Sequence, residues 1–378
     1  MSTEHGGPVT LKPIGEVAVF LKNQIPARIP EVYALKSMFK SVASEENIRR
    51  GVIAFRDFLY TLCDRLISDG DQYAKPPKKP ANMADYPFLP YLTNLLVDMG
   101  YHGKLSENGD SLRIEEIPAF TASIDEKGKK TPPKIPFFCQ IECLRFLAFC
   151  GFAFAGVDLE AKTLSISEEH VLEVSYPSNP ILLTGLKALS IADMELRTGR
   201  RYWNDNNLLR CDYRLMKAEE TDLLDVLTDF LHPLSEKVQA FALRLHRRYV
   251  EIGMTCSLRI LGDVNLAYAF IKKGKRELSP TDIYSLSIWQ FSYSIRYGYS
   301  LVVRPKKTEK YLGVIETFPS ALREVIARGY GCDRKLRNER CQQGCQGIRI
   351  PLDDSILPIS GEIETWLDHE ISYSLPKK

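Results

Sequence analysis

The chain has 378 residues, of which 44% are hydrophobic and 26% are charged, and its formal net charge is +2 at pH 7. These are the values of a globular protein with hydrophobic cores, and they exclude a chain that is disordered throughout. A charge so close to neutral gives no overall reason to expect nucleic acid or an anionic membrane as a partner.

A helical N-terminal segment is predicted over residues 1–70. The stretch VASEENIRRGVIAFRDFLYTLCDRLI carries apolar residues at helical spacing from Ile48 to Ile67. Ser44 is the expected N-cap, because its hydroxyl can accept a hydrogen bond from an amide of the first turn. The proline- and lysine-rich stretch DQYAKPPKKPANMADYPFLP follows, and it predicts an exposed linker over residues 71–87.

A domain of helices and strands is predicted over residues 88–235. Residues 89–114 and 140–166 share one pattern: an apolar helical segment, a glycine followed by an aromatic residue, and short strands. Each glycine, Gly100 and Gly151, is expected to end its helix with a positive φ. Internal duplication explains the pattern, and so does chance recurrence in α+β proteins; the sequence leaves both open.

The C-terminal part, residues 236–378, differs in its pattern. The stretches AYAFIKKG, SIWQFSYSIRYGYSLVVR, YLGVIETF and GIRIPL predict strands, and ALREVIAR and GEIETWLDHEI predict helices. The chain as a whole is therefore predicted to be α+β. It should have a helical N-terminal segment, helix–strand repeats in the middle, and a C-terminal antiparallel sheet with helices on one face.

Three cysteines lie close together near the end of the sequence: Cys332, Cys341 and Cys345. Structural zinc takes four Cys or His ligands, usually as two close pairs. No fourth ligand lies nearby, so His369 or Asp333 would have to complete a zinc site through the fold. Reduced thiols that pack a turn, or a redox-sensing thiol among basic residues, are the alternatives. We expect no bound cofactor, and zinc is the exception to test.

The same region resembles a group of small uncharacterised clostridial α+β proteins. The residues that carry the resemblance are ALREVIARGYGCDRK, CQQGCQGIRIPLDDSI and IETWLDHE, within Leu245 to Glu370. The resemblance implies an α+β fold for the C-terminal third of the chain. Those proteins often carry two cysteines where this chain has Cys332 alone, which puts metal binding in question. No activity comes with the resemblance.

Basic and aromatic residues are interleaved in TGRRYWNDNNLLRCDYRL. The candidate binding residues are Arg200, Arg201, Trp203, Arg210 and Tyr213. Such a segment can bind nucleic acid through phosphate contacts and base stacking, or hold a carboxylate or phosphate ligand. The plainer interpretation is a polar turn with half-buried aromatic rings. A second basic stretch, VVRPKKTEKY, is interpreted as a solvated hairpin tip.

Targeting patterns are lacking in the sequence. The opening residues, MSTEHGGPVT, do not have the basic and apolar regions of a signal peptide. No apolar run approaches the roughly eighteen residues of a membrane span. A cytoplasmic location is therefore expected, and the nine cysteines are expected to be reduced thiols.

The sequence contains no complete catalytic motif. Histidine pairs at metal spacing, a nucleophile elbow and a glycine-rich phosphate loop are all missing. The leading hypothesis is a non-enzymatic binding or regulatory protein that uses its aromatic C-terminal sheet. Trp289, Phe291 and Tyr293 should share one face of a strand, and Trp289 and Tyr293 are the candidate binding residues; a core face is the alternative interpretation.

Two other functions stay open. One is a small hydrolase or transferase whose site is assembled from dispersed residues. The other is a nucleic-acid-binding protein that uses residues 197–214. We expect a small molecule or a protein as the partner, in preference to nucleic acid, and no membrane.

Overall fold

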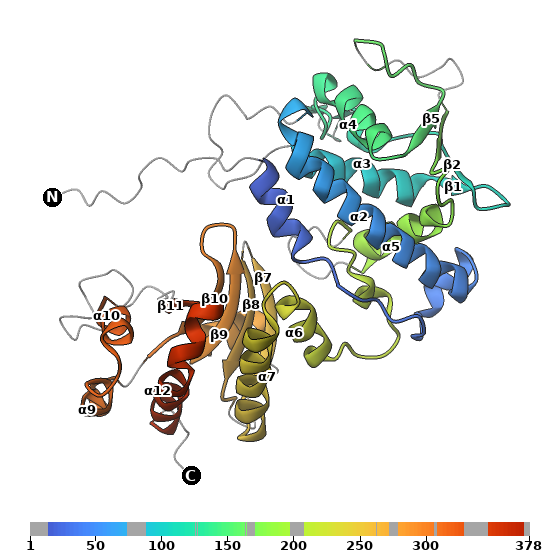
Figure 1. Cartoon of the computed structure of the whole chain (residues 1–378). Helices are drawn as coiled ribbons and strands as arrows, with labels where there is room; N and C mark the ends of the chain where they lie inside the picture. The colour runs from blue at the N-terminus through green and yellow to red at the C-terminus, as the bar shows by residue number, and fades with distance from the viewer. Residues whose placement is uncertain are drawn as a thin grey trace. The chain divides into compact units, whose positions relative to one another are not determined.

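The computed structural model divides into two compact units, residues 1–221 and 222–378. The residues that it describes are 14–73, 88–124, 126, 128–162, 164, 171–196, 208–261, 263–271, 279–305, 308–328 and 347–373. Each unit combines helices with an antiparallel sheet (Figure 1), and the α+β prediction is confirmed.

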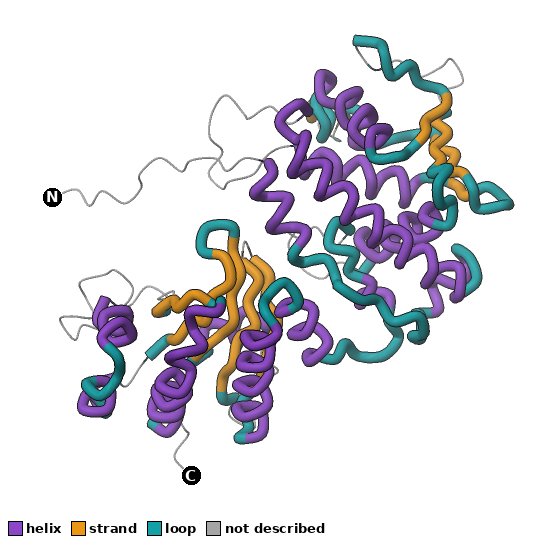
Figure 2. The backbone as a smooth tube through the Cα atoms, in the orientation of Figure 1, coloured by secondary structure: helices purple, strands orange, loops and turns teal. Residues whose placement is uncertain are grey.

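The first unit is mostly helical (Figure 2). Its α-helices are α1 (Ile14–Lys22), α2 (Glu45–Tyr73), α3 (Phe88–His102), α4 (Phe137–Phe149) and α5 (Leu182–Glu195). The long helix α2 packs against both α1 and α5, and α3 packs against α5. The predicted N-cap is confirmed, because the Asn47 amide donates a hydrogen bond to Ser44 Oγ at 3.2 Å.

A four-stranded antiparallel sheet in order β1-β2-β6-β5 accompanies these helices. Its strands are β1 (Lys104–Leu105), β2 (Ser111–Ile114), β5 (Ala153–Ala155) and β6 (Leu172–Ser175), and β3 (Ser123–Ile124) pairs separately with β4 (Lys130–Thr131). Short 3₁₀ helices cover Ser37–Ser41, Pro118–Phe120 and Tyr213–Met216. Both predicted helix–strand repeats thus contribute to one sheet; their common origin stays a prediction.

The two glycines of these repeats differ in their roles. Gly151 follows α4 with φ of +106°, as predicted for the end of a helix. The prediction for Gly100 is wrong, because this residue lies inside α3. A Cβ at Gly100 would fall 2.7 Å from the backbone oxygen of Leu186. Gly100 therefore permits the close approach of α3 to α5.

The second unit is built on a five-stranded antiparallel sheet in order β11-β10-β9-β8-β7. Its strands are β7 (Thr255–Leu261), β8 (Asp263–Ala269), β9 (Trp289–Ser294), β10 (Gly298–Val303) and β11 (Ile348–Pro351). Its helices are α6 (Leu223–Leu231), α7 (Glu236–Glu251), α8 (Pro280–Leu286), α9 (Leu312–Ile315), α10 (Ser320–Arg328) and α12 (Ser360–Ser372), with 3₁₀ helices at Thr308–Lys310 and Asp354–Ile359.

One predicted strand of this unit is helical instead. YLGVIETF contains α9. Its buried residues Ile315 and Phe318 are three positions apart, which is the spacing of one helical face. The other predicted strands of the C-terminal part correspond to β8, β9, β10 and β11.

Helices α7 and α12 lie side by side across one face of the five-stranded sheet (Figure 1). Arg244 of α7 forms an ion pair with Glu364 of α12 at 2.7 Å. Trp366 and Leu367 of α12 are fully buried, and Trp366 Nε1 donates to the Tyr311 hydroxyl at 3.2 Å. The last helix is thus fixed both by its apolar side and by charges along its exposed edge.

The predicted domain boundaries stay predictions. Within the first unit, α2 from the predicted N-terminal segment packs directly on α5 from the predicted middle domain. The second unit begins at Asp222, before the predicted boundary at residue 235. Most of the predicted linker, residues 74–87, lies outside the described residues. None of the helices in the described ranges is long and apolar enough to cross a membrane.

Candidate functional site

Alternation along the strands of the C-terminal sheet divides its side chains between two faces. Trp289, Phe291 and Tyr293 share one face, and each is at most 7% exposed. Trp289 stacks on Tyr268 of β8 with ring centroids 3.7 Å apart, and meets Tyr249 of α7 at 5.5 Å. This face is the core of the unit. A binding role for Trp289 and Tyr293 stays a prediction, and their burial gives it no support.

The opposite face of the sheet is polar, and it is buried as well. Its central residues, which we call the polar floor, are Asn265 of β8, Gln290, Ser292 and Ser294 of β9, and Ser300 of β10, each at most 3% exposed. Asn265 and Ser292 are direct neighbours across two strands, as are Ser292 and Ser300. Burying polar groups costs free energy unless they are hydrogen-bonded, so the partners of these residues decide what the face does.

Two arginines at one end of the polar floor share a single aromatic ring. The guanidinium carbons of Arg259 on β7 and Arg304 after β10 lie 4.1 Å and 4.2 Å from the ring centroid of Tyr284. The two cations therefore cannot be farther apart than the sum of these distances. Tyr284 belongs to α8, which packs against β7 and β8. Its carbonyl oxygen accepts a hydrogen bond from Arg304 Nη1 at 2.7 Å.

Both arginines retain unused donors. The Nε atoms of Arg259 and Arg304 are buried and have no hydrogen-bond partner among the residues that the structure describes. Arg304 is only 8% exposed. Within the same residues, neither arginine forms an ion pair with an acidic side chain. The carboxylate on which Arg259 acts is that of Asp263, which pairs with Arg349, so a bound anion would add a countercharge beside Arg259 and Arg304.

A third arginine lies across the other end of the polar floor. Arg349 of β11 donates to Ser292 Oγ at 3.3 Å and pairs with Asp263 at 3.4 Å. Its guanidinium carbon lies 4.5 Å from the ring centroid of Tyr297. Burial raises the pKa of Asp263, while Arg349 and then Arg259 act in the opposite direction. Arg259, Arg304 and Arg349 thus lie on this face with the Asp263 carboxylate.

This arrangement suits an oxyanion. Guanidinium groups bind carboxylate and phosphate through charge-assisted hydrogen bonds, which contribute about 1.5–3 kcal/mol each. Contact with the Tyr284 ring restricts the side chains of Arg259 and Arg304 before binding, so less side-chain entropy is lost when an anion binds. A bound anion would satisfy both Nε donors and offset the repulsion between the two cations.

Two predicted binding residues of the first unit lie in its interior. Arg210 is 4% exposed and Tyr213 is 3% exposed. Arg210 pairs with Asp212 at 3.7 Å, and the ring of Tyr213 lies 5.3 Å from that of Tyr33. Cys211, between Arg210 and Asp212 in the chain, has φ of 52°, a strained value for a residue with a Cβ. The ion pair of Arg210 with Asp212 helps to fix a tight turn against α2. In this turn Cys211 Sγ lies 3.6 Å from the carbonyl oxygen of Val52.

Other predicted site residues lie outside the described residues. They are Arg200, Arg201, Trp203, Cys332, Cys341 and Cys345. Among the residues that the structure does describe, no group of three or more His, Cys, Asp or Glu side chains could hold a metal ion. Zinc binding by the cysteine cluster, and binding by the Arg/aromatic segment, therefore both stay predictions.

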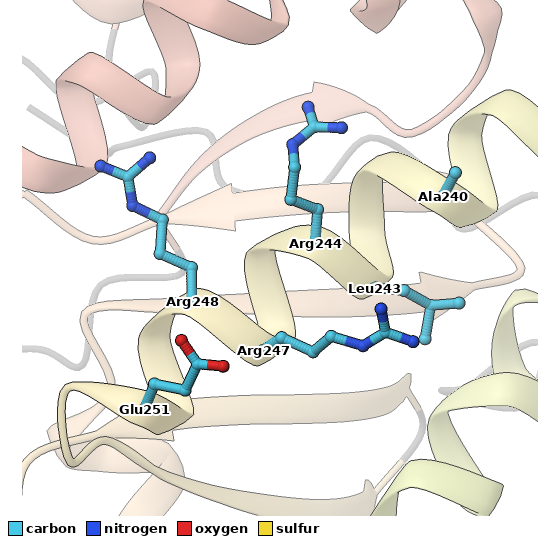
Figure 3. A pocket seen from close by; sticks show the side chains of 6 residues that line it. All are labelled: Ala240, Leu243, Arg244, Arg247, Arg248 and Glu251. Atoms are coloured by element: carbon cyan, nitrogen blue, oxygen red, sulfur yellow. The ribbon is translucent and has the colours of Figure 1, made fainter.

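A shallow hollow of about 510 Å³ lies over α7 and is lined, among described residues, by Ala240, Leu243, Arg244, Arg247, Arg248 and Glu251. Figure 3 shows Arg244 and Arg248 pointing to one side of the helix and Arg247 lying along the other. Glu364 pairs with both Arg244 and Arg248, and Asp368 pairs with Arg248 as well. Arg244 and Arg248 hold α7 to α12, so the charge of these two arginines is already balanced.

The sequence contains a signal for the polar floor that none of the predictions used. In WQFSYS the residues between the aromatic rings are Gln290, Ser292 and Ser294. These side chains are short or neutral, whereas a solvated strand face usually carries charges. The interpretation of Arg304 as part of a solvated hairpin tip is wrong, because Arg304 is buried against Tyr284.

No family model, curated protein or solved structure matches the chain. The resemblance to clostridial proteins therefore stays a prediction.

Proposed function

We propose that the chain is a non-enzymatic binding protein whose C-terminal unit holds a small anionic ligand on the polar face of its sheet. One observation carries the proposal: Arg259 and Arg304 stack on the same ring with buried Nε donors that no described residue satisfies. A small molecule is the partner that this site favours, because each residue of the polar floor is at most 3% exposed and offers no surface to a macromolecule. A cytoplasmic location, expected from the sequence, belongs to the same proposal.

A purely structural role explains less of the geometry. Stacking on Tyr284 and one bond to its carbonyl oxygen would account for one arginine at the end of a sheet. A second guanidinium group, also about 4 Å from the centroid of this ring, adds repulsion between two like charges. Neutral residues could pack α8 against the sheet at lower cost. The second cation is accounted for when a bound anion offsets the charge of both arginines.

The proposal is tested by following the arginine Nε–H groups by ¹H–¹⁵N NMR while inorganic phosphate, and separately acetate, is added. We expect the signals of Arg259 and Arg304 to move together and to saturate with either anion. Arg304→Gln should abolish the saturable shift of Arg259. Arg323→Gln, an equal change of charge at an exposed position on α10, should leave it intact.

Two results would contradict the proposal. One is an unsaturable drift of all arginine signals with both anions, which would indicate screening only. The other is an equal loss of binding in Arg304→Gln and Arg323→Gln, which would place binding elsewhere. Far-UV circular dichroism of each variant establishes that the fold is retained.

A further inference from the structure

The orientation of one buried amide gives information about the ligand. Asn265 Nδ2 donates to the carbonyl oxygen of Asp263 at 3.3 Å, so its Oδ1 is directed toward β9. There Asn265 Oδ1 accepts a hydrogen bond from Gln290 Nε2 at 3.0 Å. This chain of bonds fixes which end of the Gln290 amide carries the oxygen.

The remaining atom of that amide is an acceptor without a donor. Gln290 is 0% exposed, and its Oε1 has no hydrogen-bond partner among the described residues. Arg349, on the same face, contacts Ser292, Asp263 and the Tyr297 ring. A buried carbonyl oxygen left without a donor is unfavourable.

The register places this acceptor on the same face of the sheet as the arginine pair. Gln290 pairs directly with Val302 of β10, and Arg304 follows Val302 by two residues, on the same face. Neighbouring strands lie about 4.8 Å apart, and two residues along a strand span about 7 Å. The backbones of Gln290 and Arg304 are therefore roughly 8–9 Å apart, and the Gln290 amide extends to the other side, toward Asn265, which pairs directly with Arg259 of β7.

We infer that the ligand carries a neutral hydrogen-bond donor, an amide N–H or a hydroxyl, a few bonds from its anionic group. The anionic end binds Arg259 and Arg304, and the donor end binds Gln290 Oε1. An ammonium group is disfavoured as the donor, because three guanidinium groups surround the floor. This inference rests on the proposed function, and it narrows the ligand to hydroxy or amide acids and their phosphate counterparts.

The test compares two pairs of probes that differ only in the donor. Succinamate and 4-oxopentanoate share a carboxylate and differ by NH2 against CH3, and 2-hydroxyethyl phosphate and 2-fluoroethyl phosphate share a phosphate and differ by OH against F. Calorimetric titration of the full chain should show binding about tenfold tighter for the donor-bearing member of at least one pair. The pair that shows the preference identifies whether the anionic end is a carboxylate or a phosphate.

The Gln290→Met variant should lose this preference and bind both members of the pair equally. The comparison on the unaltered chain stands by itself, so the test does not depend on that variant being folded. Equal affinity within both pairs would overturn the inference while leaving the proposed function in place. No binding of any of the four probes would overturn the proposed function and the inference with it.

Discussion

Gly51 of α2 and Gly185 of α5 lie against each other where the two helices cross. A Cβ atom added at Gly51 would fall 2.5 Å from the backbone nitrogen of Gly185, closer than real side chains come. Backbone therefore meets backbone at this crossing, and the largest helix contact of the first unit depends on two missing methyl groups.

The Gly51→Ala variant should be destabilised by about 1–3 kcal/mol, because the helices must separate to admit the methyl group. Urea unfolding followed by circular dichroism measures the change. Gly15→Ala is the matched control, since its Cβ would meet Ile67 at an ordinary 3.5 Å; it should be neutral or slightly stabilising. Equal stability of the two variants would contradict the tight crossing.

Trp366 is expected to fix the last helix to the core of the second unit. Its side chain is fully buried, and it donates to the Tyr311 hydroxyl, which in turn donates to Glu370. Trp366→Ala should cost about 3–5 kcal/mol of unfolding free energy. Trp366→Phe, which keeps most of the bulk, should cost less than half as much. A loss below about 1 kcal/mol for the alanine variant would mean that α12 is peripheral.

The stability of the second unit should fall on mild acidification because of His246. Burial lowers the pKa of this residue, Asp222 opposes the effect and Arg247 adds to it. His246 Nδ1 lies 2.8 Å from the Tyr268 hydroxyl. The folded chain keeps the ring neutral at a pH where the unfolded chain, with a pKa of about 6.5, takes up a proton. This contribution is therefore present above about pH 6.5 and is lost as the pH falls below it.

Urea midpoints measured at about pH 7.5 and about pH 5.5 test this expectation. His246→Gln should reduce the difference between the two midpoints. His232→Gln, at an exposed position after α6, should leave the difference unchanged. The same pH dependence in both variants would show that other groups cause it.

The cysteine cluster is expected to hold no stoichiometric zinc. Three thiolates leave a tetrahedral site one ligand short, and removal of a structural zinc usually unfolds a small domain. A chelator should therefore leave the melting temperature unchanged, and Cys341→Ser should remain folded. One zinc per chain in elemental analysis, with loss of structure on chelation, would contradict this prediction and make His369 or Asp333 the ligand to test.

Local patterns predicted much of the fold. The spacing of apolar residues around Phe55 and the Ser44 hydroxyl specified α2 and its start, because both effects act within a few residues. Alternation in WQFSYS predicted that Trp289 and Phe291 share a face, because successive side chains of a strand point in opposite directions.

What could not be predicted depends on contacts between distant residues. Gly100 has the sequence context of a helix end, but its role is set by α5, whose Leu186 lies more than eighty positions away. The polar floor was hidden for the same reason. Gln290 and Arg304 come together only through strand pairing, and the ring that joins Arg304 to Arg259 is supplied by α8.

The parallel stack of Trp289 on Tyr268 makes the second unit its own optical probe. Their rings lie 3.7 Å apart at an angle of 7°, in a rigid and fully buried setting. Two chromophores held in this way should give a near-ultraviolet circular dichroism signal that vanishes when the core loosens. Trp289 precedes Gln290 on one strand, so occupation of the polar face can be followed from the opposite face without a label.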